Sequence, residues 1–404
     1  MGQECSICLV SLTNAPVSTL QCTHVFHAAC IADLLKFGVK QTCPLCRSPL
    51  PSGPEQVNQQ ATLRFMVAYL LVRRGEASWS TLPTTAQREL DAAVAGWRLA
   101  AEQGHVLAAQ SLGDLYHEGN GVAKSFVEAA RWYKKAANQG HVPAQINLGL
   151  LFLNGRGVAK SEAEASKWFR KAADQGNAEA QHNLGIRYLS GSGVRQSDTE
   201  AAYWWKKAAE QGHALAQYNY GVLFQDGRGL AHSRETAAQW WTKAADQGVV
   251  GAQCNLGNAF NLGLGVVQNS AESVRWFRKA AEQGHVQAQT YTGHHFRDGR
   301  GVVQSDSEAA RWYRIAADQG EMDAQTELGK FYRDGRGVAQ SDVEAVRLFK
   351  KAADRGFAGA QYNMGVSFEK GRGVAQSDVE AKRWFKKAAA QGHAGALLMM
   401  RSYT

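Results

Sequence analysis

Eight side chains of types that bind metal ions lie within the first 46 residues, at a spacing that predicts two zinc sites. They are Cys5, Cys8, Cys22, His24, His27, Cys30, Cys43 and Cys46. Zinc prefers four thiolate and imidazole ligands in a tetrahedron, and a two-residue gap lets both sulfurs of a Cys-x-x-Cys pair reach one ion. Eight ligands fill two such shells and leave no open position for a substrate water. We therefore expect two structural zinc ions and no catalytic zinc.

Disulfide bonds are the alternative use of these cysteines. The chain opens Met1-Gly2-Gln3-Glu4 without the apolar stretch of a secretory signal, so we expect a protein that is not secreted, with reduced cysteines. The first fifty residues hold too few large apolar side chains for a self-sufficient core, because small domains bury little surface. Each structural zinc contributes roughly 10–16 kcal/mol of apparent folding free energy. This segment is therefore predicted to be unfolded without metal.

The same segment resembles the RING finger of the two-histidine type. The resemblance rests on Cys5-Ser6-Ile7-Cys8, on Cys22-Thr23-His24-Val25-Phe26-His27-Ala28-Ala29-Cys30, and on Cys43-Pro44-Leu45-Cys46-Arg47. It implies a small cross-braced α+β fold over residues 1–50. It also implies how the ligands divide: Cys5, Cys8, His27 and Cys30 on one zinc ion, and Cys22, His24, Cys43 and Cys46 on the other.

The resemblance further implies a RING-type E3 ubiquitin ligase, which forms no covalent intermediate with ubiquitin. Such a domain binds a ubiquitin-conjugating enzyme charged with ubiquitin and orients the thioester for attack by a substrate lysine. The family's contact positions fall on Ile7, Leu34 and Pro44, and its linchpin position falls on Arg47. Many members carry tryptophan where this chain has Leu34, so the choice of conjugating enzyme stays open. The alternative is a non-catalytic adaptor that uses a zinc-bound RING and the rest of the chain for protein–protein interaction.

Residues 106–393 repeat every 36 residues without an insertion, which gives eight units. One column is glycine throughout, from Gly113 to Gly365, with alanine five residues earlier and an aromatic residue three residues later. A fixed period of this length predicts a solenoid. The columns resemble Sel-1-like repeats, relatives of the tetratricopeptide class. The expected architecture is thus a RING followed by an all-α solenoid of antiparallel helix pairs, and the resemblance implies a right-handed superhelix.

Each unit is predicted to hold two helices. The second helix begins with an N-cap residue followed three positions later by glutamate, as in Ser125 and Glu128, which predicts a capping box. Ser233 departs from this pattern because Thr236 takes the place of the glutamate. Closing glycines such as Gly140 suit the left-handed residue that ends a helix. The Gly-x-Gly turns are not phosphate loops, because no strand precedes them and no lysine follows in the required place.

The regions outside the eight units complete the predicted organisation. Residues 51–84 form a linker with an amphipathic helix over Val57 to Arg74, whose apolar run is too short to span a bilayer. Residues 85–105 form an N-terminal half repeat, and residues 394–404 a partial repeat that closes the array.

Composition narrows the classes of partner. The net charge of +9 is spread over 404 residues without a dense basic stripe, which argues against nucleic acid as a partner. No convergent set of ionisable residues recurs in the repeats, so they are not expected to form an enzyme, and the lone Cys254 is expected to be packed or idle. We predict a soluble protein of the cytoplasm or nucleus without a transmembrane segment.

The repeats are predicted to recruit a protein substrate or scaffold through variable columns of the first helices. These columns lie three residues before the column glycine, one residue after it and four residues after it. Offsets of three and four residues place them on one helix face. The predicted contact residues are Tyr218, His294, Arg297 and Arg333, which suit a partner segment with an apolar anchor followed by acidic residues.

Overall fold

The computed structural model describes residues 17–19, 25–27 and 54–402. Two short strands, β1 (Val17–Thr19) and β2 (Val25–His27), pair antiparallel with Val17 opposite His27. The remaining described residues are helical with short connections. The chain divides into two compact units, residues 1–208 and 209–404.

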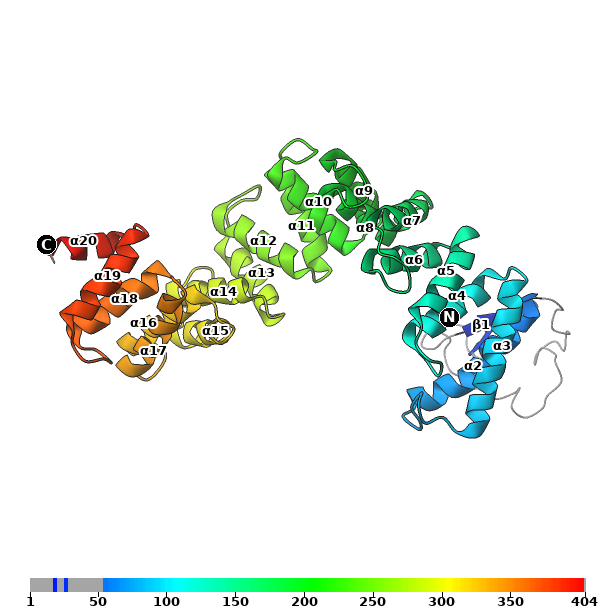
Figure 1. Cartoon of the computed structure of the whole chain (residues 1–404). Coiled ribbons are helices and arrows are strands. Elements are labelled where there is room, and N and C mark those ends of the chain that lie inside the picture. Colours follow the sequence, from blue (N-terminus) through cyan, green and yellow to red (C-terminus); the bar gives the residue numbers. More distant parts are fainter. Residues whose placement is uncertain (1–16, 20–24, 28–53, 403–404) are drawn as a thin grey trace. The chain divides into compact units, whose positions relative to one another are not determined.

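The repeats form helix pairs, as predicted, and consecutive helices lie side by side within each unit (Figure 1). The first helices of the eight repeats are α4 (Val106–Glu118), α6 (Val142–Asn154), α8 (Ala178–Ser190), α10 (Ala214–Asp226), α12 (Val250–Leu262), α14 (Val286–Asp298), α16 (Met322–Asp334) and α18 (Ala358–Lys370). The second helices are α5 (Phe126–Asn138), α7 (Glu162–Asp174), α9 (Asp198–Glu210), α11 (Arg234–Asp246), α13 (Ser270–Glu282), α15 (Asp306–Asp318), α17 (Asp342–Asp354) and α19 (Asp378–Ala390).

Additional helices precede and follow the repeats. Helices α2 (Pro54–Arg73) and α3 (Thr84–Glu102) come before them, and α20 (Ala394–Ser402) comes after them. Helix α2 packs on α3, where Phe65 stacks on Trp79 and contacts Trp97, and where Trp97 donates to Thr62 Oγ1. Among the helices of the described residues, none has both the length and the hydropathy to cross a bilayer.

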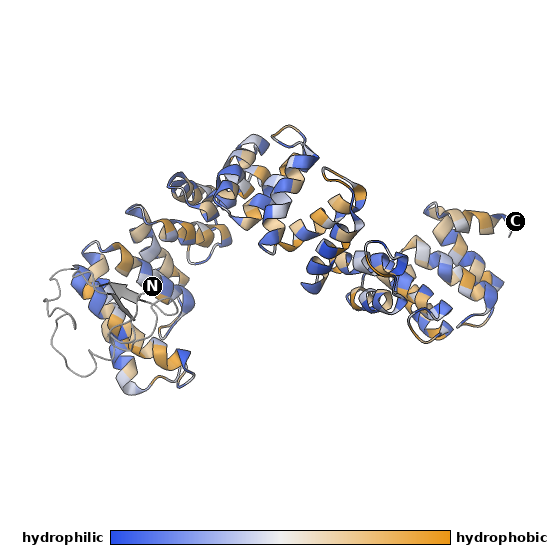
Figure 2. Ribbon diagram, turned by 180° about the vertical axis from the view of Figure 1, so that it is seen from behind, coloured by the Kyte–Doolittle hydropathy of each residue, from blue (hydrophilic) through white to orange (hydrophobic). Residues whose placement is uncertain are grey.

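The column glycine lets an aromatic ring of the second helix pack against the first helix. A Cβ atom on Gly113 would lie 2.4 Å from the Tyr133 ring, and one on Gly293 would lie 2.6 Å from the Tyr313 ring. Both tyrosines are almost fully buried. At the column glycine the close approach is therefore made by an aromatic ring and not by the backbone of a neighbouring helix. Figure 2 shows that most helices carry both hydrophobic and hydrophilic residues, as this one-sided packing requires.

Glycines of the Gly-x-Gly turns join one repeat to the next. A Cβ atom on Gly301, which has a φ of +72°, would lie 2.3 Å from the backbone of Ser270 at the start of the preceding second helix. Gly337 meets Asp306 in the same way. These turns are therefore contacts between neighbouring repeats.

The capping box is half formed. Ser125 Oγ accepts from the Glu128 amide at 3.3 Å, as predicted, but the Ser125 amide donates to the Tyr116 carbonyl at 2.9 Å. Because that amide is already bonded, Glu128 pairs with Arg131 instead. Ser233, which departs from the pattern, accepts through its Oγ from the Thr236 amide at 3.1 Å, so its N-cap is intact.

A ladder of glutamine side chains also connects neighbouring repeats. Gln289 Nε2 donates to the carbonyl of Ala281, and Gln289 Oε1 accepts from Gln319 Nε2 of the same repeat at 2.8 Å. Gln145 and Gln175 repeat these bonds in the first unit. The first-helix glutamines are buried, so the ladder satisfies their polar groups away from water.

Candidate protein-binding surfaces

The predicted zinc sites belong mostly to the part of the chain outside the described residues. Only His27, at the end of β2, lies within it. The other seven ligands lie outside, as do Ile7, Leu34, Pro44 and Arg47. The donor set of six thiolates and two imidazoles fits two closed zinc shells. Within residues 17–19, 25–27 and 54–402, no three histidine, cysteine or acidic side chains gather as metal ligands.

Tyr218 lies in α10 and is half-buried rather than open to a partner. A Cβ atom on Gly251, in the next first helix, would lie 3.0 Å from its ring, and its side chain bonds to Asn255. Burial raises the pKa of Tyr218. Tyr218 therefore contributes to packing between neighbouring first helices.

Carboxylates compensate the three predicted basic residues, His294, Arg297 and Arg333. His294 Nε2 lies 3.1 Å from Asp323 Oδ2, and its Nδ1 lies 2.7 Å from the Tyr313 hydroxyl. Arg297 donates to Asp298 at 2.7 Å and to Glu327 at 2.8 Å. Glu327 also accepts from Lys330, and Arg333 donates to Asp334. This network binds adjacent repeats to each other and leaves little free positive charge for an acidic partner.

The electrostatics of this network follow from its hydrogen bonds. The bond from Arg297 holds the pKa of the Asp298 carboxyl well below its usual range, and the His294 bond lowers the pKa of Asp323. Both carboxylates stay ionised at neutral pH. The compensation is visible in the sequence, because Asp298 and Asp334 directly follow Arg297 and Arg333.

The three predicted contact columns differ in accessibility. The column before the glycine is mostly buried, with exposed fractions of 6% at Ile146, 5% at Cys254 and 2% at Thr326. Burial raises the pKa of the Cys254 thiol to about 11, which makes it a packed and unreactive side chain. The two columns after the glycine are partly or fully exposed, and Leu150 is 36% exposed. Only these two columns offer contact area to a partner.

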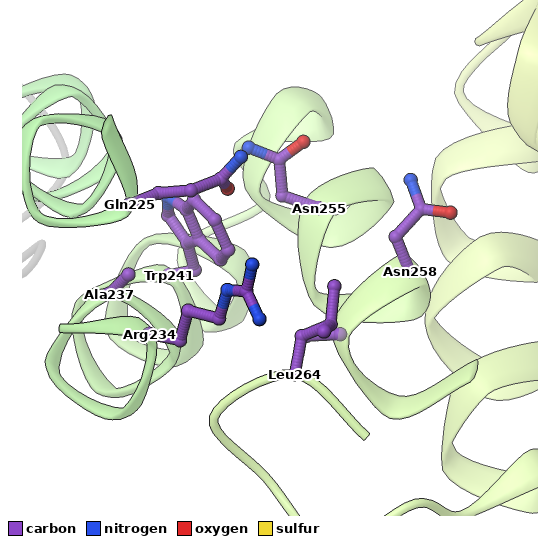
Figure 3. Close-up of a pocket in the computed structure, with 8 residues that line it drawn as sticks. Gln225, Arg234, Ala237, Trp241, Asn255, Asn258 and Leu264 are labelled. Carbon is purple, nitrogen blue, oxygen red and sulfur yellow. The ribbon is translucent and has the colours of Figure 1, made fainter. Parts of the chain in front are cut away.

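A cavity of about 220 Å³ opens between α10, α11 and α12 in the second unit (Figure 3). Its polar lining consists of Gln225, Arg234, Asn255 and Asn258. Its apolar lining consists of Ala237, Trp241, Ala259 and Leu264. Gln225 and Asn258 belong to the two accessible columns. The sequence prediction did not include Arg234, although it is a cation in a column that is mostly acidic elsewhere: Glu162, Asp198, Asp306, Asp342 and Asp378.

These helix pairs and their repeated junctions define a helical-repeat protein. The family model "Sel1 repeat" matches residues 106–141, 142–177, 178–213, 214–249, 250–285, 286–321, 323–357 and 358–393. The family model "Ring finger domain" matches residues 3–47. The chain belongs to the Sel1 repeat family and carries a RING domain of the two-histidine type, so both predicted resemblances are confirmed.

Solved structures share the repeat fold. The protective antigen c5321 of uropathogenic Escherichia coli, which displays an SLR fold, is 31% identical with a TM-score of 0.65; the match covers 87% of this chain and 82% of that one. A Sel1 repeat protein from Oxalobacter formigenes is 30% identical with a TM-score of 0.58, over 93% of this chain and 99% of that one. The predicted all-α solenoid is confirmed, whereas the RING fold lies outside the described residues.

Curated relatives match the RING segment. The E3 ubiquitin-protein ligase RHA2B of Arabidopsis thaliana is 46% identical over 50 residues, which are 12% of this chain and 33% of that protein. The chain spans about a third or less of the length of the curated relatives it matches. The likeness is therefore to the RING domain of ubiquitin ligases.

Proposed function

We propose that this protein is a RING-type E3 ubiquitin ligase whose Sel1 repeats recruit the substrate or a scaffold. The observation that carries the proposal is the complete set of eight zinc ligands followed directly by Arg47, within a segment similar to RING domains of named ubiquitin ligases. Cys5, Cys8, His27 and Cys30 would hold one zinc ion, and Cys22, His24, Cys43 and Cys46 the other. The bound ions supply the rigidity that a domain of this size cannot obtain from its core.

The proposed catalytic step is one of orientation. Ile7, Leu34 and Pro44 contact the conjugating enzyme, and Arg47 donates hydrogen bonds that hold the enzyme and its thioester-linked ubiquitin in one arrangement. A guanidinium suits this role because its planar set of donors can bond two acceptors at once. The substrate lysine then attacks a thioester that is already positioned.

The repeats supply the recruiting surface in this proposal. Its support is the pair of accessible first-helix columns that vary from repeat to repeat, together with the known use of stacked repeats as extended binding surfaces. His294, Arg297 and Arg333 belong to these columns and Tyr218 borders them, and all four also contact neighbouring repeats. The proposed location is the cytoplasm or nucleus, where ubiquitin is charged and transferred.

The deciding experiment is ubiquitin discharge from a panel of charged conjugating enzymes by the full-length chain. Wild type should accelerate discharge with at least one enzyme. Arg47→Ala should lower the rate by roughly tenfold or more, because a group that positions a thioester acts only in the reactive arrangement, while its zinc content stays unchanged. Ile7→Ala should lower the rate by weakening binding of the conjugating enzyme, so a higher enzyme concentration should restore it.

The competing function is a zinc-dependent adaptor without ligase activity. Leu34 favours it, because many RING ligases carry tryptophan at that position. Leu34→Trp separates the two functions: a ligase with a weak enzyme contact should become faster. Equal discharge by wild type, Arg47→Ala and a reaction without the chain, across the whole panel, would establish the adaptor instead.

A further inference from the structure

The junction between the fourth and fifth repeats lacks a contact that other junctions have. Between the sixth and seventh repeats, Arg336 of the turn donates to both carboxylate oxygens of Asp306, at 2.7 and 3.1 Å. Between the first and second repeats, the Arg156 guanidinium lies 5.4 Å from the centre of the Phe126 ring. In each case the two residues are 30 positions apart, one in the turn and one at the start of the preceding second helix.

The same pair of positions holds Arg234 and Leu264 at the junction of the fourth and fifth repeats. Arg234 stands at the position that Asp306 holds in the sixth repeat, and Leu264 stands at the turn position that Arg336 holds in the seventh repeat. Among the described residues, no hydrogen bond or ion pair satisfies the Arg234 guanidinium, and the residue is exposed. The backbone beneath it is fixed, because a Cβ atom on Gly265 would lie 2.2 Å from the Arg234 carbonyl.

A third substitution opens space beside this guanidinium. Ala259 stands where other repeats carry larger side chains: Leu115, Leu151, Leu223, His295 and Phe331. The result is the cavity of about 220 Å³, with Arg234 reaching across it and the Trp241 indole forming its apolar wall (Figure 3). Pockets for small molecules usually measure about 300–1,000 Å³, so this cavity matches a single side chain of a partner.

The polar lining selects a carboxylate. No acidic side chain lines the cavity in the described part of the chain. Arg234 offers a planar pair of donors that matches a carboxylate group. The carboxamides of Gln225 and Asn258 add further donors at the rim, and Asn255 is bonded to Tyr218. An anion in the cavity therefore finds charge and hydrogen bonds that the protein itself leaves unused.

The turn next to the cavity begins with an aliphatic residue, Leu262, only in this repeat. Leu262 is 61% exposed and Val267 is 88% exposed, on either side of the cavity-lining Leu264. The positions equivalent to Leu262 are polar in every other repeat: Glu118, Asn154, Ser190, Asp226, Asp298, Asp334 and Lys370. Exposed aliphatic side chains beside a charged pocket are typical of a protein-binding surface.

We propose that this cavity binds the carboxylate of a glutamate or aspartate side chain in an extended segment of a partner protein. An aliphatic residue of the same segment packs on Leu262 and Val267. The inference rests on the proposed recruiting role of the repeats and gives the recruited segment its chemistry: an acidic residue adjacent to an aliphatic one.

The test uses the full-length chain and pools of degenerate heptapeptides with blocked ends and a fixed central residue. Pools fixed as glutamate or aspartate should be retained in preference to the pool fixed as glutamine. Equal retention of the three pools would overturn the proposal. A preference for pools with a free C-terminus, whatever the central residue, would assign the cavity to a terminal carboxylate and also overturn it.

Two single variants locate the bound peptide. Arg234→Gln removes the charge, and Ala259→Leu fills the cavity with the residue that Leu223 provides in the neighbouring repeat. Each variant should lower the affinity for the selected peptide by about tenfold to a hundredfold, which is the range expected for the loss of a charged hydrogen bond. Arg347→Gln removes an exposed cation elsewhere in the second unit and should leave affinity unchanged. Loss of affinity in that control as large as in Arg234→Gln would mean that binding depends on general charge.

A paired exchange provides a folded variant without the site. Arg234→Asp combined with Leu264→Arg recreates the ion pair seen between Asp306 and Arg336, so it should melt no lower than wild type and bind no peptide. Retained peptide binding by this variant would overturn the proposal. These measurements involve no ubiquitin. A negative result in peptide binding would therefore count against the cavity proposal alone, and a negative result in ubiquitin discharge against the ligase proposal.

Discussion

Arg355 occupies the position from which a glutamine would donate to Gln325, and it donates to the backbone carbonyl of Gly320 instead. Gln325 Oε1 is consequently buried without a hydrogen-bond partner among the described residues. In the fourth repeat, Gln247 Nε2 serves both acceptors, the carbonyl of Gly212 at 3.0 Å and Gln217 Oε1 at 2.8 Å. The seventh repeat thus carries a local defect in an otherwise repeated set of bonds.

Arg355→Gln is expected to stabilise the second unit. The new side chain would keep the bond to Gly320 and add one to Gln325, which removes a buried unsatisfied oxygen and adds about 1 kcal/mol to the free energy of unfolding. Urea unfolding followed by circular dichroism measures the change. The opposite variant, Gln319→Arg, should lose a similar amount by leaving Gln289 unsatisfied. A stabilising effect of both variants would contradict this account.

Gly257→Ala is expected to destabilise the fifth repeat. Its Cβ atom would lie 2.8 Å from the ring of the fully buried Phe277, and overpacking of a core typically costs about 1–3 kcal/mol. The gain in helix propensity of alanine over glycine, about 1 kcal/mol, offsets part of that cost. Thermal melts of the two single variants and of Gly257→Ala with Phe277→Leu give the coupling. The double variant should be more stable than the sum of its parts; simple additivity would show that the ring is not the obstacle.

His295 is expected to make stability fall as the pH falls below neutrality. Burial lowers the pKa of His295 in the folded chain, against the bond that its Nδ1 makes with the Arg300 carbonyl at 2.7 Å. In the unfolded chain its pKa is about 6.5. Because the unfolded chain binds the proton more readily, the contribution is present above pH about 6.5 and is lost as the pH falls towards the folded value.

The measurement compares urea unfolding at pH 7.5 and pH 5.5. His295→Leu, which introduces the residue of position 223, should show a smaller loss over this range than wild type. His232→Gln serves as the control, because it removes an exposed histidine elsewhere in the second unit. A wild-type loss equal to that of His295→Leu would assign the dependence to other histidines.

Metal removal is expected to separate the RING segment from the repeats. Elemental analysis should find two zinc ions per chain, since eight ligands in the first 46 residues form two closed sets. Chelation should unfold the first fifty residues because they lack a core of their own, while the helical circular dichroism of the repeats persists. One zinc ion per chain, or a helical loss on chelation as large as on heating, would refute the prediction.

Features that repeat with the period were predictable from the sequence. The N-cap residues, the closing glycines and the helix pairs depend on residues that recur in the same place, so eight copies reinforce one signal. The reciprocal half of the capping box was not predictable in this way. The Ser125 amide is taken by the Tyr116 carbonyl, a backbone bond that leaves no trace in residue identity.

The predicted contact face was harder to derive, because it depends on the packing of one repeat against the next. Helix periodicity groups Tyr218 with its neighbours on one face, yet it does not show that Gly251 brings the next helix against that ring. The basic residues Arg297 and Arg333 suggested an acidic partner, whereas Glu327 and Asn363 of the following repeats accept their hydrogen bonds. The cavity was not predictable from the sequence for a related reason, because it needs Arg234, Ala259 and Leu264 together, from two different repeats.

The contacts between neighbouring repeats recur at a uniform spacing, and this spacing affects how the chain can gain or lose whole repeats in evolution. Loss or gain of a whole 36-residue block keeps every glutamine and every turn glycine opposite its usual neighbour, so unequal recombination between blocks yields a folded product. The junction of Arg234 with Leu264 is the exception. Deleting the fifth block would place Arg234 opposite Arg300, and deleting the fourth block would place Asp198 opposite Leu264. Loss of one block at this point would preserve the architecture and remove the pocket. Selection for the pocket would therefore keep the fourth and fifth repeats adjacent during evolution.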